Sequence, residues 1–127
     1  MKTIYIAGPM RGYTRYNFDA FHHAEDCLSM GGWNPINPAR IDLENGFDPD
    51  GPVTPTMMDA FIRRDFECIM RVEGIAVLPG WEKSVGATAE VFMALWRGIP
   101  VYAFPSMVPI EREAAIQLLF TMQTIAA

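Results

Sequence analysis

Cysteine is nearly absent from this chain of 127 residues, which contains only Cys27 and Cys68. Two cysteines cannot form the dense disulfide framework of a small secreted domain, so we expect free thiols in a reducing, cytoplasmic compartment. No apolar run reaches the roughly 18 residues that a membrane span requires. No basic segment followed by an apolar stretch opens the chain, so the sequence predicts neither an export signal nor a membrane partner.

An excess of positive charge is also missing. Ten Lys and Arg residues stand against 15 Asp and Glu residues, for a net charge of −5. Proteins that bind nucleic-acid polymers present a basic face, so a nucleic acid is not expected as the main partner. A small anionic ligand is still compatible, because a few local donors can outweigh a weak overall field. The chain has no repeats, and its length fits one domain over residues 1–127.

The chain does contain short apolar runs that alternate with helical patterns. Strands are predicted at 3–7, 33–36, 74–78 and 100–104, and helices at 17–30, 55–71, 84–97 and 109–125, with Asn17 as an N-cap. The segment 37–56 is rich in Pro, Gly, Asp and Asn, and it is predicted to be a long loop. This alternation is typical of an α/β fold with a parallel sheet of four to five strands. Ligands bind beyond the carboxyl ends of such strands, so the loops at 8–16, 37–56 and 79–86 are expected to share one crevice.

The most informative stretch is the strand at 74–78 together with the loop and helix start that follow it. The helix start carries Ser84, Gly86 and Glu90. Helix N-termini bind anions, because their first backbone N–H groups lack partners. A carboxylate just inside such a site can act as the nucleophile of glycosyl transfer by trapping an oxocarbenium-like centre. The alternative is a solvated helix glutamate, but Ala87, Ala89 and Val91 favour a packed setting for Glu90.

Two further residues are candidates for the same site. Asp65 follows Arg63 and Arg64 on the preceding helix, and it could orient a sugar hydroxyl or act as a general acid. Its alternative role is an ion pair with a neighbouring arginine. Tyr5 lies inside the first strand, where a tyrosine is usually part of the core. It gains a role in the site only if its hydroxyl reaches the carboxylate of Glu90.

The loop after the first strand is a candidate phosphate-binding segment. Gly8 and Gly12 permit close backbone approach, and Arg11, which follows Met10, suits bidentate contact with a phosphate. Ser84 and Gly86 would complement this loop from the other side of the crevice. Ordinary turn and cap chemistry is the alternative for both segments.

Taken together, these blocks resemble the nucleoside 2-deoxyribosyltransferase superfamily. The chain is similar to its small bacterial and phage members and to the 2-deoxynucleoside 5-monophosphate N-glycosidases. The resemblance is carried by Ile4-Tyr5-Ile6-Ala7-Gly8 with Met10-Arg11-Gly12, by Arg64-Asp65, and by Ser84-x-Gly86-x-x-x-Glu90 followed by Ile99-Pro100-Val101-Tyr102. It covers about residue 3 to about residue 104. It implies a flavodoxin-like three-layer sandwich and chemistry at the N-glycosidic bond of 2-deoxynucleosides or their 5-monophosphates.

The resemblance also implies roles for individual residues. Glu90 would match the nucleophile that attacks the anomeric carbon, Asp65 the acid that handles the sugar or the leaving base, and Tyr5 the residue that holds the nucleophile. The phosphate cradle would include Arg11, Ser84 and Gly86. Pro9 departs from the pattern, because it stands where those enzymes carry a serine and offers neither a hydroxyl nor an N–H group.

We therefore expect an enzyme of nucleoside or nucleotide metabolism that cleaves the base–sugar bond, with water or a second base as the acceptor. Such chemistry needs no metal or organic cofactor. One alternative is a sensor that binds a nucleotide or ribosyl ligand without turnover, and another is an inert interaction domain. The family analogy and an apolar late helix predict a homodimer or a higher homo-oligomer. The apolar positions of that helix are Ala115, Ile116, Leu118, Leu119, Phe120 and Met122.

Overall fold

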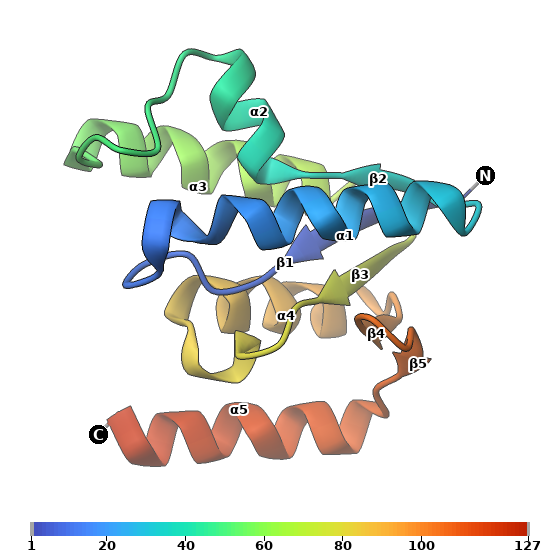
Figure 1. Ribbon diagram of the computed structural model, residues 1–127. Helices are drawn as coiled ribbons and strands as arrows, with labels where there is room; N and C mark the ends of the chain where they lie inside the picture. The colour runs from blue at the N-terminus through green and yellow to red at the C-terminus, as the bar shows by residue number, and fades with distance from the viewer. Residues whose placement is uncertain (1, 127) are drawn as a thin grey trace.

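A computed structural model shows strands that alternate with helices along most of the chain (Figure 1). It describes residues 2–126, with side chains described for residues 2–120. The strands are β1 (Thr3–Ala7), β2 (Asn34–Ile36), β3 (Gly74–Val77), β4 (Val101–Ala103) and β5 (Val108–Pro109). The helices are α1 (Phe18–Met30), α2 (Pro38–Glu44), α3 (Pro55–Ile69), α4 (Val85–Arg97) and α5 (Arg112–Ala126). Two short 3₁₀ turns, η1 (Thr14–Asn17) and η2 (Trp81–Lys83), precede α1 and α4.

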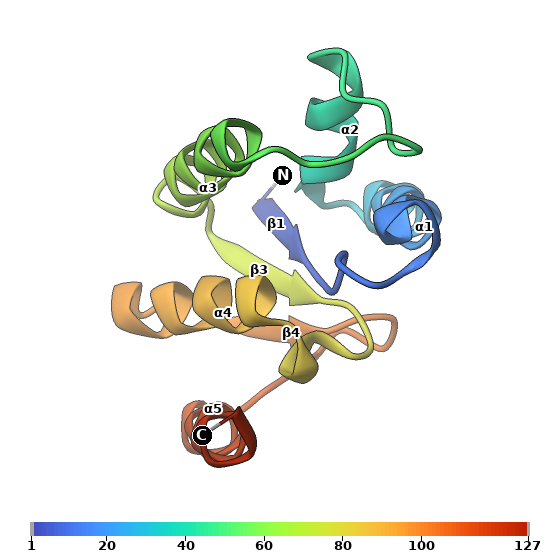
Figure 2. The same ribbon diagram turned by 90° about the vertical axis from the view of Figure 1, so that its left-hand side faces the viewer.

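The five strands form one sheet in the order β2-β1-β3-β4-β5, with helices on both faces (Figure 2). This is the predicted α/β class, and it is consistent with a flavodoxin-like sandwich. The first four strands are parallel, but β5 runs antiparallel to β4. The four predicted strands are therefore parallel, as expected, and β5 is an additional antiparallel strand at the edge of the sheet. Pro109, predicted to open the last helix, instead pairs with Tyr102, and α5 begins at Arg112.

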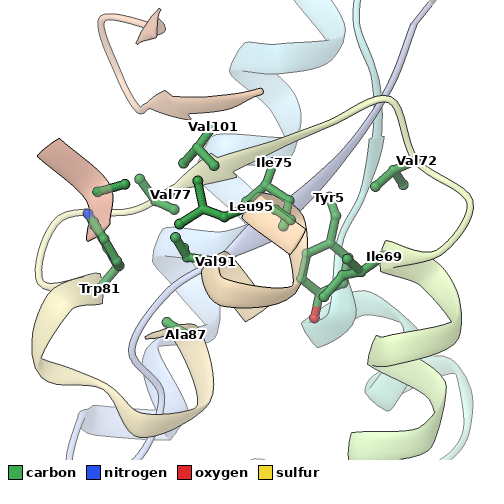
Figure 3. Packing of buried hydrophobic residues seen from close by; sticks show 13 residues of the cluster. Tyr5, Ile69, Val72, Ile75, Val77, Trp81, Ala87, Val91, Leu95 and Val101 are labelled. Carbon is green, nitrogen blue, oxygen red and sulfur yellow. The ribbon is translucent and has the colours of Figure 1, made fainter. Parts of the chain in front are cut away.

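The two faces of the sheet carry separate apolar clusters, as the period of two along a strand requires. Ile4 and Ile6 of β1 pack with α1 on one face. Tyr5 and Ala7 pack on the other face, with α4 and the end of α3 (Figure 3). The strand β3 is buried throughout, as predicted for a strand covered on both faces. These contacts fix α3 and α4 against the middle of β1.

Local capping explains where the two helices of the site begin and end. The Ser84 hydroxyl accepts a hydrogen bond from the Ala87 N–H at 3.2 Å, and Gly98 closes α4 in the left-handed region with φ 76°. At the start of α3, Thr54 accepts a hydrogen bond from the Met57 N–H at 3.2 Å, and Pro55 occupies the first turn. Ser84 and Gly98 therefore confirm the bounds of the helix predicted at 84–97.

Two local predictions are wrong. Asn17 does not cap α1, because its backbone is left-handed with φ 63° and its side chain donates to the Pro9 carbonyl at 2.9 Å. Part of the predicted loop at 37–56 is the helix α2. The buried side chain of Asn37 accepts from the Ala39 N–H at 2.9 Å, and Pro38 sets the first helical φ.

Between residues 2 and 126, no helix has both the length and the apolar character needed to cross a membrane. Within the same range, no group of three or more His, Cys, Asp or Glu side chains could hold a metal ion. Cys27 and Cys68 are free thiols, as expected.

Candidate functional site

The candidate site is centred on a contact between β1 and α4. The hydroxyl of Tyr5 donates a hydrogen bond of 2.5 Å to Oε2 of Glu90. Tyr5 is only 1% exposed, and its ring packs beside Ile69 in the cluster shown in Figure 3. The strands β1 and β3 are the neighbours at which the chain order reverses, which is where open α/β sheets bind ligands. The Tyr5 hydroxyl thus reaches the carboxylate of Glu90, which is the contact that its predicted role requires.

Glu90 lies in the second turn of α4 and is partly buried. Ala87 and Val91 are buried, as the sequence suggested, but Ala89 is exposed. The difference follows from helix geometry, since adjacent residues lie about 100° apart around the axis. Glu90 therefore lies at the edge of the packed face of α4. There it is only partly exposed to solvent, and its carboxylate accepts the hydrogen bond from Tyr5.

Asp65 and Arg64 form the second half of the site. Arg64 donates to Oδ1 of Asp65 from Nε at 3.0 Å and from Nη2 at 2.7 Å. The remaining Nη1 of Arg64 donates to Oδ1 of Asp42. Tyr5 lowers the pKa of Asp65, and the charge of Asp65 raises the pKa of Glu90, so Asp65 lies near both members of the Tyr5–Glu90 pair. The predicted ion pair of Asp65 with a neighbouring arginine is therefore present, and Asp65 also lies near Tyr5 and Glu90.

This arrangement shifts the proton affinity of every member. Burial and the charge of Asp65 raise the pKa of Glu90 to about 8, against the effects of the Tyr5 hydrogen bond and Arg64. Burial raises the pKa of Asp65 to about 6, although Arg64 lowers it. Burial and the charges of Glu90 and Asp65 raise the pKa of Tyr5 well above its usual value, so its hydroxyl remains a donor. Burial therefore raises the pKa of both carboxyls, and it does so more strongly for Glu90 than for Asp65.

Asp42 is the most deeply buried acid of the cluster, at 4% exposure, and it was not predicted from the sequence. Burial raises the pKa of this carboxyl, and the hydrogen bond and charge of Arg64 lower it. Asp42 falls within the segment that was predicted to be a loop. The Asn37-Pro38 pair is a helix-start signal that could have revealed α2. Once α2 is formed, the side chain of Asp42 lies between the helix and Arg64.

The loop predicted to bind phosphate is buried at its start and exposed at Arg11 and Gly12. Gly8 is buried, and a Cβ there would lie 2.9 Å from side-chain atoms of Leu78, so the glycine permits close packing after β1 and β3. Met10 is half-buried and packs on the α1 side of the sheet. Arg11 and Gly12 are exposed, and Gly12 has φ 86°. Within the described part of the chain, Arg11 makes no ion pair or hydrogen bond, so its guanidinium is available to a ligand.

At the start of α4, the Ser84 hydroxyl already has a hydrogen-bond partner, whereas the space beside Gly86 is open. The Ser84 oxygen is engaged as the N-cap of the helix. Gly86 is exposed, and a Cβ built on it would meet no atom within 4 Å. The structure therefore leaves open space above this turn, where the backbone N–H groups of the first turn lack helical partners.

The three loops predicted to converge are joined through the first of them. Arg15 pairs with Asp50 at 2.5 Å, and the Tyr16 hydroxyl donates to the carbonyl of Gly51 at 2.9 Å. On the other side, the Tyr13 hydroxyl lies 2.9 Å from where a Cβ of Gly80 would be. The loop after β1 thus contacts both the segment after α2 and the loop after β3.

A separate apolar groove lies between α4 and α5, on a different face of α4 from Glu90. It encloses about 290 Å³ and is lined by Phe92, Leu95, Trp96, Arg112, Ile116, Leu119 and Phe120. Of the α5 positions expected at an oligomer interface, Ala115 is buried and Leu118 is exposed, and the side chain of Met122 lies outside the described residues. Self-association remains a prediction.

Comparisons with known proteins place the chain in a family. Residues 2–103 match the family model described as "Domain of unknown function (DUF4406)". No curated protein matches the chain. Among solved structures, the chain is similar to a conserved protein from Enterococcus faecalis V583, at 24% identity and a TM-score of 0.51. The similarity covers 81% of this chain and 62% of the other, so this chain spans about three fifths of that protein. It supports the fold alone.

Proposed function

This chain belongs to the DUF4406 family, whose function is unknown, and we propose that it cleaves or transfers the N-glycosidic bond of 2-deoxynucleosides or their 5-monophosphates. The observation that carries the proposal is the 2.5 Å hydrogen bond between Tyr5 and Glu90, next to the carboxylate of Asp65. The resemblance of the sequence to the nucleoside 2-deoxyribosyltransferase superfamily supports the same reaction. In that superfamily pattern, a glutamate at this point of the helix is the nucleophile.

In the proposed reaction, an oxygen of Glu90 attacks the anomeric carbon of the sugar. The C–N bond breaks, its electron pair leaves with the base, and the base takes up a proton. Water or a second base then attacks the glycosyl ester and releases Glu90 as a carboxylate. Two displacements of this kind retain the configuration at the anomeric carbon.

Tyr5 and Asp65 serve this reaction in different ways. The Tyr5 hydrogen bond fixes one oxygen of Glu90 and lowers the pKa of that carboxyl, which favours the ionised nucleophile. The Asp65 carboxylate is available to orient a sugar hydroxyl or to protonate the leaving base. For a monophosphate, Arg11 and the first turn of α4 at Gly86 would hold the phosphate.

A ligand sensor without turnover is the second candidate. The raised pKa of Glu90 favours it, because a protonated carboxyl is a poor nucleophile. Pro9 does not separate the two candidates, because the hydroxyl that it lacks would weaken phosphate binding in either of them. The exposed Arg11 suits either candidate.

A screen for released base tests the proposal. The purified chain is incubated with each deoxynucleoside and each deoxynucleoside 5-monophosphate, with and without a second base as acceptor, and the products are separated by chromatography. Free base in the absence of an acceptor indicates a hydrolase, and a new nucleoside indicates a transferase. Tight binding of one ligand without any released base would instead support the sensor.

A further inference from the structure

We propose that Arg64, held by the buried carboxylate of Asp42, is a positioning residue that orients Asp65 and keeps it anionic. This inference deepens the proposed function and rests on it for its catalytic consequence. None of the residue roles implied by the resemblance includes Asp42 or Arg64 as a positioning group. The two residues are 22 positions apart in the sequence and come from different helices, α2 and α3.

The guanidinium of Arg64 is held on three sides. Nη1 donates to Asp42, and both Nε and Nη2 donate to Asp65. Its Cζ lies 5.4 Å from the ring centroid of Phe61, one turn earlier on α3. A planar guanidinium with three engaged nitrogens cannot rotate without losing a charge-assisted hydrogen bond. The orientation of Arg64 is therefore fixed before any substrate binds.

Arg64 leaves one oxygen of Asp65 for other partners. Both contacts from Arg64 converge on Oδ1 of Asp65, at 3.0 and 2.7 Å. The orientation of Oδ2 is thereby set as well, because the two oxygens belong to one rigid group. An Asp65 kept anionic in this way accepts hydrogen bonds from its surroundings and carries no proton to donate. Within the proposed reaction, this favours contact with a sugar hydroxyl over protonation of the leaving base.

Asp42 explains why α2 is part of the site. Asn37 and Pro38 start α2, and Asp42 lies one turn further on, only 4% exposed. A buried carboxylate is stable only when it is paired, and Arg64 is its partner. The segment after α2 also contacts the loop after β1 through Arg15 and Asp50. The arrangement of Asp65 thus depends on a segment distant from it in the sequence.

Several charged or titratable groups face Asp65. They are Tyr5 of β1, Asp42 of α2, Arg64 and Cys68 of α3, and Glu90 of α4. Arg64 is the only cation of this set. Its removal exposes Asp65 to two neighbouring carboxyls with no compensating charge, so the proton affinity of Asp65 must rise.

The test is a titration of the Asp65 carboxyl carbon by NMR in the full chain. In R64Q, the midpoint of Asp65 should move to higher pH by about 1–3 units. In R64K the Asp65 midpoint should return most of the way to its value in the natural chain, because lysine keeps the positive charge. It should not return fully, because lysine lacks the planar fork that orients Asp65. The matched control is R40Q, since Arg40 of α2 also binds a carboxylate, that of Glu25 at 2.6 Å, and should leave the Asp65 midpoint unchanged.

An Asp65 midpoint in folded R64Q that equals that of the natural chain would overturn the proposal. If R64Q does not fold, R64K provides the test. Lysine keeps the charge but lacks the planar fork that contacts Asp42 and Asp65 together, so the Asp65 midpoint should lie above that of the natural chain, and an unchanged midpoint would overturn the proposal.

Base release separates this inference from the proposed function. Where the natural chain releases base, D42A should lower kcat at least tenfold with little change in KM, and D42N should recover most of it. If the NMR shifts occur but no substrate is cleaved, the positioning role of Arg64 stands and the proposed function fails. If base is released but the midpoints do not move, the proposed function stands and the positioning role of Arg64 fails.

Discussion

The hydroxyl of Tyr5 and the carboxylate of Glu90, 85 residues apart in sequence, lie 2.5 Å from each other. One belongs to the central part of a buried strand and the other to the second turn of a helix that packs on it. This contact joins the apolar core to the candidate site, so substitutions on either side of it have separable effects on stability and on activity.

Tyr5→Phe removes the donor and keeps the ring in the core. A hydrogen bond to a charged group contributes about 1.5–3 kcal/mol, so kcat should fall roughly 10- to 150-fold. The Tyr5 hydrogen bond lowers the pKa of Glu90, so the rise of activity with pH should also move to higher pH. Tyr102→Phe is the control, because Tyr102 packs on Trp33 in the opposite cluster. Equal rates for both variants over the whole pH range would contradict the role of Tyr5.

Glu90→Gln should stabilise the fold at alkaline pH. The pKa of Glu90 is raised in the folded chain from its usual 4.5 to about 8. The folded state therefore binds more protons between these values, and the stability that protonated Glu90 contributes is lost as the pH rises through 8. The variant should exceed the natural chain by about 1–3 kcal/mol at pH 9 and match it near pH 4. Urea unfolding across this range measures the difference, and a constant difference would contradict the assignment.

Asn37→Ala tests the helix that the sequence reading missed. The substitution removes the acceptor for the Ala39 N–H and the donor to Glu25, which lies at 3.1 Å. Loss of a side-chain cap typically costs about 1–2 kcal/mol, and the free energy of unfolding should fall by that amount. Asn45→Ala, at the exposed end of α2, is the matched control and should change it little. A similar loss of unfolding free energy in both variants would show that the Asn37 cap does not stabilise α2 more than the exposed Asn45 does.

The helix α4 could be predicted almost to the residue, because its signals are local. Ser84 is a good N-cap, Gly98 suits a left-handed C-terminus, and the apolar positions between them repeat at helical spacing. The short strand β5 could not be predicted, because two residues carry no periodic pattern and pairing with Tyr102 requires the completed sheet.

The site was predictable in part for a similar reason. Glu90 and Asp65 stand in a recognisable strand–loop–helix pattern, whereas the ion pair of Asp42 with Arg64 depends on the packing of α2 against α3. In a segment dense in Pro, Gly and Asp, the helix-start signal of Asn37-Pro38 is outweighed by turn signals. No local rule links a residue there to an arginine 22 positions later.

Arg11→Ala distinguishes a phosphate-binding site from a nucleoside site. Arg11 is exposed and pairs with no acid of the described chain. If it binds the 5-phosphate, the variant should raise KM for monophosphates roughly tenfold or more and leave KM for nucleosides unchanged. Arg63→Ala, an exposed arginine of α3, is the control. If the natural chain binds a nucleoside and its monophosphate equally well, and Arg11→Ala changes neither affinity, Arg11 does not bind the 5-phosphate.

The rate of base release by Glu90→Gln is the sharpest test of Glu90 as the nucleophile. Glutamine keeps the size of the side chain and an acceptor for the Tyr5 hydroxyl but cannot form the glycosyl ester. We expect kcat to fall by roughly 10³-fold or more while the substrate binds as tightly as before, because the lost interaction belongs to the transition state. Glu113→Gln, an exposed position of α5, should retain full activity. Turnover that survives Glu90→Gln nearly intact would contradict the account and move the chemistry to another group.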